Sequence, residues 1–497
     1  MSDIEIINKN HVKLQVKCDM SIAQELNEHF SFEVPNAKFH PLVRNKVWDG
    51  KVRLFSLYTK EIYVGLLKYI EHFAEANQYS ISTSEYRVTA DEVTYKKVEE
   101  FCKELQLTSG GKPIDIRDYQ IDAVYQGISN GRQLLLSPTG SGKSLIIYCI
   151  MRWHQQFGRK QIIIVPTTSL VEQMYADFQD YSQQNDWKAS YNCHRIYSGS
   201  AKTNDMPVTI TTWQSVYKLP KKFFAEFNTV FGDEVHLFKA KSLTGLLEKH
   251  TDTPFRIGTT GTLDGSKTHK LVLEGLFGPV YKVTTTRKLM DDDQLADLKI
   301  TALILNYPEE IKKMISKLKY QEEMDFLVKF NPRNRFITNL ALDQSGNTLV
   351  LFQFVEKHGR DLVEMIKKKG KDTHKVFFVY GGTDTEARET VRHLTEENNN
   401  AIIVASYGTF STGINIRNLH NIIFASPSKS RIRNLQSIGR GLRKGDNKQS
   451  CNLFDIGDDL TWKSRKNYTL QHMVERIKIY NDEGFDYKLA KVDLNAV

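Results

Sequence analysis

The sequence predicts an α/β protein with two tandem parallel-sheet domains, a small α+β domain ahead of them and a helical tail behind them. Short apolar runs recur along the chain, and helix-period stretches separate most of them, which is typical of βαβ units. These runs fall into two series, with a break between about residues 281 and 335. The expected strands are residues 134–136, 162–165, 208–212, 229–231 and 256–259 in the first series, and 348–352, 376–379, 401–405 and 421–425 in the second.

Length and composition place the chain among ordinary globular proteins. Its 497 residues allow about three domains, and its 40% hydrophobic and 26% charged residues exclude a disordered chain. The 68 Lys and Arg residues exceed the 59 Asp and Glu residues, which gives a net charge of +9. This excess favours a polyanionic partner, although a solvated basic surface explains it equally well.

The sequence carries no signal for secretion or for membrane insertion. Charged and polar residues interrupt the first residues, so a signal peptide is not expected, and nowhere do about 18 apolar residues follow one another. Five scattered cysteines without a CxxC pair argue against a zinc site and fit a reducing compartment. We therefore expect an intracellular, cytoplasmic protein.

Five segments are expected along the chain. Residues 1–90 form a small accessory domain, in which Asp49-Gly50 lies between two β-like runs as in a hairpin and residues 64–76 have helical periodicity. The others are a nucleotide-binding domain at residues 91–285, a linker with a helical connection at 286–330, a second parallel-sheet domain at 331–455 and a helical tail at 456–497.

A phosphate-binding loop is predicted where an apolar strand runs into a helix. Such a loop needs glycines that let backbone N–H groups curl around phosphates, a lysine charge, and a hydroxyl that holds Mg²⁺. The chain meets these requirements, although Ser137 stands where the GxxxxGK[ST] pattern has its first glycine. The residues expected to bind nucleotide are Thr139, Gly140, Ser141, Gly142, Lys143 and Ser144, of which Ser144 also holds the metal.

The second half of this site is predicted at Asp233-Glu234-Val235-His236, directly after the expected strand at residues 229–231. One carboxylate suits a metal ion and its neighbour suits proton abstraction, so we expect Asp233 to hold Mg²⁺ and Glu234 to polarise the attacking water. Two adjacent acids are usually a solvated turn. Their place after an apolar strand favours the catalytic interpretation.

Residues 233–236 also resemble the DExH box of superfamily 2 helicases, and this resemblance covers about residues 117–444. The whole arrangement is similar to the UvsW-type helicases of T-even bacteriophages. The resemblance implies two RecA-like domains that use ATP and Mg²⁺. It also implies an adenine-binding motif at Arg117, Tyr119 and Gln120, although a helix N-terminus alone would explain these residues equally well.

Two further motifs follow from the same resemblance. Thr260-Gly261-Thr262 stands where the family has Ser-Ala-Thr, so Thr260 and Thr262 are expected to couple His236 to the nucleic-acid site. Residues 436–443 match QxxGRxxR. Arg440 and Arg443 lie on one helix face and are expected to pair with the γ-phosphate, with Gln436 at the nucleotide. A basic helix that faces DNA is the alternative for these arginines.

Nucleic-acid contacts are expected on both parallel-sheet domains and on the first 90 residues. The resemblance places them at Thr167, Thr168, Thr212, Gln214, Thr412 and Gly413, whose hydroxyls and backbone amides suit phosphate oxygens, although plain helix caps would look the same. In the accessory domain Arg44 and Lys51 alternate with Trp48 and Phe55, a pattern that suits single strands. The alternative is that the rings pack a small core.

The resemblance implies an ATP-dependent 3′-to-5′ DNA helicase that unwinds and branch-migrates stalled forks, Holliday junctions, D-loops and R-loops. Recombination, repair and replication restart in an infected host cell are the expected setting, with single-stranded-DNA-binding or recombination proteins as possible partners. Three alternatives stay open. They are a double-stranded DNA translocase, an RNA helicase with the same motor core, and a P-loop kinase, which would leave the second domain unexplained.

Overall fold

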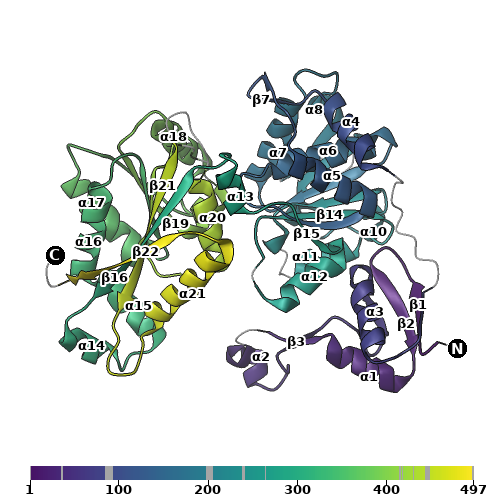
Figure 1. The fold of residues 1–497 in the computed structure, drawn as a ribbon, viewed down its shortest axis with the longest axis horizontal. Coiled ribbons are helices and arrows are strands. Elements are labelled where there is room, and N and C mark those ends of the chain that lie inside the picture. Colours follow the sequence, from purple (N-terminus) through teal and green to yellow (C-terminus); the bar gives the residue numbers. More distant parts are fainter. Residues whose placement is uncertain are drawn as a thin grey trace. The chain divides into compact units, whose positions relative to one another are not determined.

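The structure is a computed structural model that describes residues 2–34, 37–83, 93–197, 205–237, 241–263, 265–413, 416, 418–428, 430–442 and 448–494. The chain forms two compact units, one of residues 1–137 and 141–284 and the other of residues 285–497 together with residues 138–140 (Figure 1). Within these described ranges, no helix is both long and apolar enough to cross a membrane.

The N-terminal domain is built on a four-stranded sheet with the order β5-β2-β1-β6. Its strands are β1 (Ile4–Asn8), β2 (Lys13–Cys18), β5 (Glu61–Tyr63) and β6 (Ile81–Thr83), of which only β6 runs parallel to its neighbour. Alternate residues of β1 and β2 are buried, as expected for a sheet with one covered face. The helices α1 (Met20–His29) and α3 (Leu67–Ala76), the latter preceded by a 3₁₀ turn η2 (Val64–Leu66), contribute to the same core.

The hairpin predicted at Asp49-Gly50 is wrong. The short strand β4 (Lys51–Arg53) pairs with β3 (Ser31–Glu33) and not with the residues just before it. The segment ahead of this turn contains η1 (Ala37–Phe39) and the helix α2 (Pro41–Arg44) instead of a strand. Pro41 starts the helix, because proline fixes a φ that suits the first helical position. Asp49-Gly50 is the turn into β4, and Gly50 has a φ of 79°, which favours glycine.

The rest of the first unit is a fully parallel seven-stranded sheet with the order β11-β12-β10-β13-β14-β9-β15. It contains all five strands predicted for the first series, plus β11 and β15. Every residue of β10, β12 and β14 is buried, as expected where helices cover both faces. The strands are β9 (Arg132–Leu136), β10 (Gln161–Val165), β11 (Cys193–Ile196), β12 (Val208–Thr212), β13 (Thr229–Gly232), β14 (Phe255–Thr260) and β15 (Val280–Lys282).

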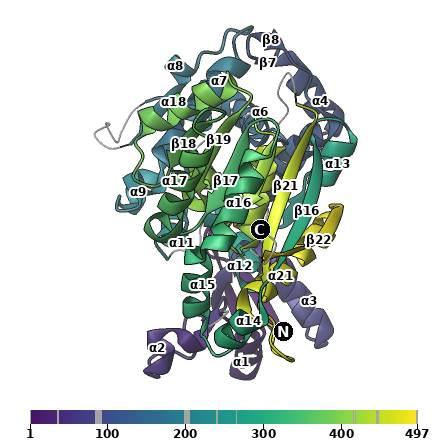
Figure 2. The same cartoon turned by 90° about the vertical axis from the view of Figure 1, so that its left-hand side faces the viewer.

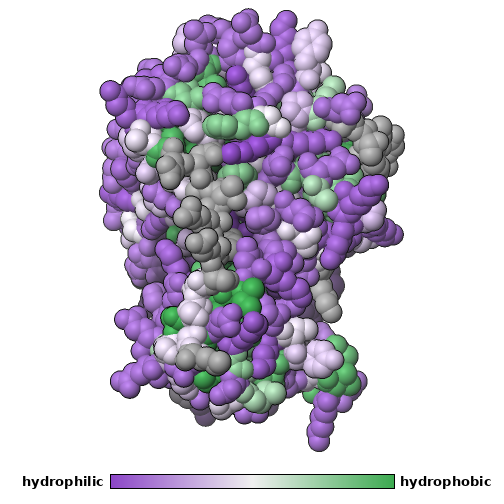
Figure 3. Space-filling view, turned by 90° about the vertical axis from the view of Figure 1, so that its right-hand side faces the viewer, coloured by the Kyte–Doolittle hydropathy of each residue, from purple (hydrophilic) through white to green (hydrophobic). Residues whose placement is uncertain are grey.

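Helices and short turns connect these strands. They are α4 (Tyr95–Glu104), α5 (Asp118–Asn130), α6 (Lys143–Gln156), α7 (Thr168–Tyr181), α8 (Ala189–Asn192), α9 (Trp213–Val216), α10 (Lys221–Phe224), η3 (Val235–Leu237), α11 (Lys241–Glu248) and α12 (Lys267–Phe277). A small ladder of β7 (Thr108–Ser109) and β8 (Lys112–Pro113) lies between α4 and α5. Figure 3 shows one face of this unit, where hydrophilic residues predominate and hydrophobic ones gather in small groups.

The N-terminal domain is packed firmly onto the first parallel-sheet domain. The hydroxyl of Tyr63 donates to Glu248 and that of Tyr69 donates to Glu274, each at 2.6 Å. One hydrophobic core contains residues of both domains. A Cβ added at Gly65 would overlap the backbone carbonyl of Glu274, so the two backbones approach more closely than any side chain at position 65 would allow. The N-terminal domain is therefore part of the first unit and not a tethered appendage.

The second unit is another fully parallel seven-stranded sheet, with the order β18-β19-β17-β20-β21-β16-β22. The predicted α/β class with two parallel sheets is confirmed. Residues 297–306, expected in the linker, form β16, and residues 487–493, expected in the helical tail, form β22. The strands are β16 (Asp297–Asn306), β17 (Thr348–Phe352), β18 (Lys375–Val379), β19 (Ala401–Ser406), β20 (Asn421–Phe424), β21 (Ser450–Asp459) and β22 (Tyr487–Asp493).

Helices cover both faces of this second sheet. Figure 2 shows α16 and α17 in front of it, and Figure 1 shows α20 and α21 on the other side. The helices are α13 (Thr286–Asp291), α14 (Glu309–Ile315), α15 (Tyr320–Lys329), α16 (Asn331–Leu342), the π-helical turn η4 (Val355–Gly359), α17 (Arg360–Lys369), α18 (Thr385–Glu396), α19 (Tyr407–Gly413), α20 (Arg431–Gly441) and α21 (Tyr468–Glu483).

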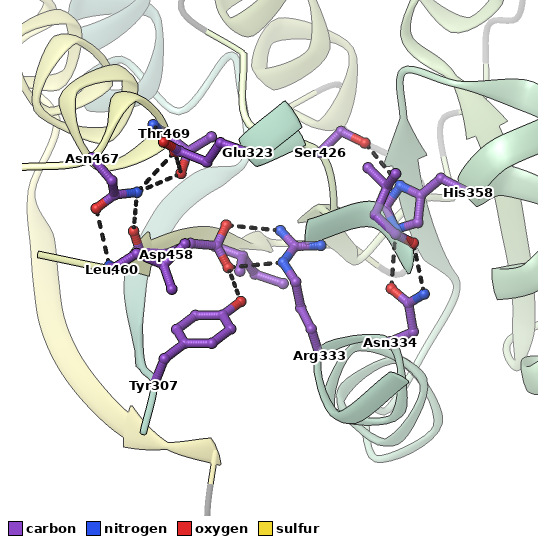
Figure 4. Close-up of polar contacts among 12 residues, drawn as sticks. Tyr307, Glu323, Arg333, Asn334, His358, Ser426, Asp458, Leu460, Asn467 and Thr469 are labelled. Carbon is purple, nitrogen blue, oxygen red and sulfur yellow. Dashed lines mark hydrogen bonds and ion pairs between the residues drawn. The ribbon is translucent and has the colours of Figure 1, made fainter. Parts of the chain in front are cut away.

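Buried polar side chains join α16 to the strand end of β21 (Figure 4). The guanidinium of Arg333 donates to both carboxylate oxygens of Asp458, at 2.8 and 3.1 Å, and the hydroxyl of Tyr307 donates to the same carboxylate at 2.7 Å. All three side chains are buried. Such a group is tolerated inside a protein only when its charges are paired and hydrogen-bonded, so it fixes α16 to the sheet.

Candidate nucleotide and nucleic-acid sites

The predicted phosphate loop joins β9 to α6. Gly140 and Gly142 have φ values of 87° and 82°, a left-handed backbone that favours glycine, and α6 begins at Lys143. Ser137 occupies the position of the missing first glycine. It is buried, its hydroxyl lies 2.5 Å from that of Ser141, and it is not among the residues of positive φ, so glycine is not required there. Thr139 is half-buried within the loop.

The predicted adenine motif is hydrogen-bonded to this loop. Gln120 accepts from the backbone N–H of Arg117 at 3.0 Å and donates to the carbonyl of Ser141 at 2.8 Å, and the hydroxyl of Tyr119 donates to the same carbonyl at 3.2 Å. Arg117 is the N-cap of α5, so the helix-terminus interpretation also holds. Both ends of the Gln120 amide are engaged within the protein, and adenine recognition by Gln120 would require one of these bonds to be exchanged.

Lys143 and Ser144 project from the first turn of α6. The ammonium group of Lys143 lies 3.5 Å from Glu234 Oε1 and 3.4 Å from the carbonyl of Ser137. The hydroxyl of Ser144 lies 2.7 Å from that of Tyr181, at the end of α7. Burial raises the pKa of the Tyr181 phenol, so it stays protonated and available as a donor. Nothing in the sequence marks Tyr181 as a site residue, apart from its place in an expected helix.

Asp233 lies at the carboxyl end of β13 and is only 7% exposed. Its Oδ1 accepts from the Thr259 hydroxyl at 2.7 Å and from the Glu234 backbone N–H at 2.9 Å. Burial, and then the nearby Glu234 charge, raise the pKa of Asp233 to about 6. A buried carboxylate held in this way gains from a cation, which fits a Mg²⁺ ligand. Thr259 was missed by the sequence interpretation, which singled out only its neighbours.

Glu234 connects the phosphate loop to a buried relay. Its φ of 49° is a left-handed conformation that is uncommon outside glycine, and such strain gathers at functional sites. Its two carboxylate oxygens point to different partners, Oε1 to Lys143 at 3.5 Å and Oε2 to His236 Nδ1 at 3.2 Å. The structure thus brings together the lysine and the carboxylate that the sequence analysis assigned to catalysis.

The predicted coupling residues are also in contact. His236 is buried, and its Nδ1 lies 2.9 Å from the hydroxyl of Thr260 at the end of β14. That hydroxyl donates to the carbonyl of Thr262 at 2.9 Å. Thr262 takes part through its backbone, because its own hydroxyl has no hydrogen-bond partner among the described residues. The relay is thus the pair of contacts that His236 Nδ1 makes with Glu234 Oε2 and with the Thr260 hydroxyl.

The predicted nucleic-acid residues of the first unit gather at the ends of two neighbouring strands. Thr167 and Thr168 follow β10, and Thr212 ends β12, which pairs with β10. The side chain of Gln214 reaches the carbonyl of Pro166 at 3.4 Å and so joins the two strand ends. Thr167 is also the N-cap of α7, because its hydroxyl accepts a hydrogen bond from the backbone N–H of Leu170 at 3.3 Å. The cap interpretation therefore holds for this residue.

In the second unit the structure describes only part of the predicted set. Gln436 and Arg440 lie on α20, and the Arg440 guanidinium carbon lies 5.8 Å from the centroid of the Phe410 ring on α19. Thr412 and Gly413 end α19, but their side-chain surroundings are outside the described part. Arg443 lies outside the described residues altogether.

On the N-terminal domain, Arg44 ends α2 and Lys51 begins β4, and both are exposed. Neither forms an ion pair within the described ranges, whereas the neighbouring Arg53 pairs with Asp49 and holds the pKa of Asp49 at about 2. Of the two predicted rings, Phe55 is buried in the core, as the alternative interpretation had it. Trp48 stays half-exposed and its indole N–H donates to the Lys51 carbonyl at 2.8 Å.

Two features define the class of two-domain helicase motors. The first parallel sheet carries a phosphate loop, an acidic box and a buried relay, and a second parallel-sheet domain follows it. Comparison with known sequences agrees. Residues 3–84 match the family model for the DNA helicase UvsW N-terminal domain, residues 113–265 that for the res subunit of type III restriction enzymes, and residues 331–445 that for the helicase conserved C-terminal domain.

One relative covers the chain almost from end to end. It is 35% identical to the ATP-dependent DNA helicase uvsW of Enterobacteria phage T4, over 99% of this chain and 100% of that protein. The crystal structure of T4 UvsW superposes with a TM-score of 0.53 at 33% identity, over 99% of this chain and 100% of that one. The DNA 3′-5′ translocase XPB2 of Sulfurisphaera tokodaii is 24% identical over 67% of this chain and 80% of its own length. The chain belongs to the UvsW family of helicases and is an ATP-dependent enzyme, and the resemblance expected from its motifs is confirmed.

Proposed function

We propose that the chain uses ATP hydrolysis to unwind branched DNA and to move its branch points, at stalled forks, Holliday junctions, D-loops and R-loops, in recombination, repair and replication restart. The single observation that carries this proposal is the relay from Glu234 through His236 to Thr260. It links the carboxylate that follows β13 to the end of β14, at the same carboxyl edge of the parallel sheet where β10 and β12 present polar residues. The full-length similarity to a DNA helicase supports DNA as the substrate.

The nucleotide half of the proposal rests on groups that suit a phosphate and a cation. Backbone N–H groups of the loop, the start of α6 and the ammonium group of Lys143 would hold the phosphates. Ser144 and Asp233 would hold Mg²⁺, which when bound supplies charge neutralisation at the β- and γ-phosphates. The buried Asp233 carboxylate, whose pKa is raised, fits this group well because a cation offsets the unfavourable burial.

Glu234 would orient the attacking water and accept its proton. In the structure described here this carboxylate contacts both Lys143 and His236. When Lys143 turns to a phosphate, Glu234 loses one partner and keeps the other, so ATP binding would poise it for water. Arg440 and Arg443 of the second domain would pair with the γ-phosphate oxygens, and Gln436 would approach the nucleotide.

The DNA half of the proposal rests on the strand ends and on the N-terminal domain. Thr167, Thr168, Thr212, Gln214, Thr412 and Gly413 would contact phosphates without reading sequence. Arg44 and Lys51 would add contacts from the N-terminal domain, because both are exposed cations without an ion-pair partner among the described residues. Two apolar side chains lie close to them in the sequence and are strongly exposed, Phe39 by 69% and Val47 by 73%. Cations beside exposed apolar side chains suit a junction between duplex and single strand.

Strand displacement on matched substrates tests the proposal. A forked duplex and a four-way junction, each with one labelled strand, are incubated with ATP and the protein, and Glu234→Gln serves as the hydrolysis-dead control. We expect ATP-dependent separation of both substrates by the wild-type protein and none by Glu234→Gln. ATP hydrolysis without displacement of either substrate would overturn the proposal.

A second candidate, a translocase that moves on duplex DNA without separating it, is favoured by one finding. Residues 113–265 match the res subunit of type III restriction enzymes. Displacement of a third strand from a linear triplex separates the two candidates. Removal of the third strand from an otherwise intact duplex, with no activity on the fork, would favour the translocase.

A further inference from the structure

The connection from β20 to α20 is held by side chains from three helices. The hydroxyl of Tyr407, at the start of α19, donates to the carbonyl of Ser426 at 3.0 Å. The carbonyl of Ser428 accepts twice, from Arg476 Nη1 of α21 at 3.2 Å and from Asn434 Nδ2 of α20 at 3.3 Å. One backbone carbonyl thus ties the first turns of α20 to the C-terminal helix α21.

Arg476 is itself held firmly. Its Nε lies 2.8 Å from Asp455 Oδ1 and its Nη2 lies 2.8 Å from the same oxygen, while Nη2 also donates to the carbonyl of Ile456 at 3.0 Å. The hydroxyl of Tyr480 donates to Asp455 Oδ2 at 2.7 Å. All three side chains are buried. The planar fork of the guanidinium serves the carboxylate and the Ser428 carbonyl at once, which a lysine ammonium group on its single stem does not.

The helix fixed in this way carries the residues that the proposed function places at the γ-phosphate. Asn434 is buried at the beginning of α20, and Gln436 and Arg440 follow within two turns. A displacement of the start of α20 therefore moves Arg440 as well. Small displacements of groups that stabilise a transition state lower the rate strongly while they change ground-state binding little.

We propose that Arg476 is a positioning residue for ATP hydrolysis, which acts through the Ser428 carbonyl to fix α20 and hence Arg440. Residues of the expected helical tail then form part of the motor. This inference rests on the proposed role of Arg440. A buried ion pair contributes little stability compared with apolar packing. A role in fixing the position of α20 therefore explains the buried Arg476–Asp455 pair better than stability does.

Arg476→Lys is the test variant, because it keeps a positive charge beside Asp455 but removes the donor that α21 supplies to the Ser428 carbonyl, while Asn434 keeps its own. We expect kcat of the DNA-stimulated ATPase to fall about tenfold while KM for ATP changes less than about twofold. Tyr480→Phe is the matched control, since it removes one hydrogen bond to the same Asp455 and leaves Ser428 untouched. It should lower Tm by a similar amount and keep kcat within about twofold of the wild type.

Two outcomes would overturn the inference, provided that the assays run well below the Tm of each variant. One is an unchanged kcat in Arg476→Lys. The other is an equal loss of kcat in Tyr480→Phe, which would mark the whole cluster as structural. Arg440→Ala is measured alongside. If Arg440→Ala hydrolyses ATP normally, the proposed function of Arg440 fails, whereas an inactive Arg440→Ala with a normal Arg476→Lys rejects only the positioning role.

Discussion

The ammonium group of Lys143 lies 3.5 Å from Glu234 Oε1, so the phosphate loop and the acidic box are joined by an ion pair that is mostly shielded from solvent. If Lys143 binds the phosphates as we propose, ATP and Glu234 would compete for the same cation. Nucleotide binding would draw Lys143 toward the phosphates and leave Glu234 with His236, 3.2 Å from its Oε2. One ion pair can therefore hold the hydrolytic carboxylate inactive until substrate arrives.

Lys143→Ala is expected to lower the DNA-stimulated ATPase by about a hundredfold or more, because the phosphates lose their point charge. DNA affinity should change less than about threefold, since the ammonium group of Lys143 contacts Glu234 and the Ser137 carbonyl, which are not among the residues expected to bind DNA. Steady-state ATPase and DNA-binding titrations measure both. Lys160→Ala is the matched control, because it removes a lysine that pairs with Glu226 and contacts the Phe227 ring and that belongs to neither predicted site. Near-normal hydrolysis by Lys143→Ala would reject the site.

Asp233→Asn is expected to stabilise the protein at pH 8 in the absence of Mg²⁺. The folded-state pKa of Asp233 is about 6, above its ordinary value of 3.8, so the ionised carboxylate costs stability above pH 6, and the cost fades as pH falls toward 4. The gain at pH 8 is roughly 2–3 kcal/mol at most and should vanish near pH 4. Thermal unfolding at both pH values measures it.

The exposed Asp252 provides the control for this experiment, and Asp252→Asn should change Tm little at either pH. For the wild-type protein the same raised pKa predicts that Mg²⁺ affinity declines as pH falls through about 6, where Asp233 of the metal-free protein becomes protonated. A variant Asp233→Asn that is less stable than the wild type at pH 8 would contradict the burial argument.

Thr260→Val is expected to uncouple DNA from hydrolysis. It removes the hydroxyl that contacts His236, so the stimulation of ATPase by DNA should fall about tenfold while the rate without DNA changes less than about threefold. Thr262→Val is a close control, because the Thr262 hydroxyl has no hydrogen-bond partner among the described residues. Equal losses in both variants would mean that the relay has no part in coupling.

Gly65→Ala is expected to weaken the docking of the N-terminal domain and to lower Tm by several degrees. The added Cβ would overlap the Glu274 carbonyl, and overpacking of this kind costs about 1–3 kcal/mol. Gly245→Ala, in the interior of α11, meets no atom within 4 Å and should leave Tm unchanged or raise it slightly. Calorimetry of both variants compares them, and an unaltered Tm in Gly65→Ala would refute the close approach.

The sequence was informative where physical chemistry imposes a local pattern. Buried parallel strands are continuous apolar runs, so all nine predicted strands could be located from the chain alone. Lys143, Glu234 and His236 could be named because phosphate and water chemistry restrict the residue types and their order. Their mutual contacts could not be predicted, since they depend on how three strands align in the sheet.

The sequence was uninformative where tertiary packing decides. Residues 297–306 and 487–493 have alternating or charged patterns, yet they complete the second sheet as β16 and β22, because β21 offers an edge for β16 and β16 offers one for β22. Tyr181 and Arg476 carry no motif, and only the folded chain brings them to Ser144 and Ser428. The hairpin predicted at Asp49-Gly50 is wrong because a helix that begins with proline, and not a strand, precedes this turn.

The most direct test of the central claim is the ATPase rate of the pure protein under four conditions. These are no nucleic acid, single-stranded DNA, single-stranded RNA and a synthetic forked DNA. A motor that remodels branched DNA should be stimulated by DNA and most strongly by the fork. Equal or greater stimulation by RNA would contradict the DNA assignment, and a fast rate that no nucleic acid changes would contradict the motor itself.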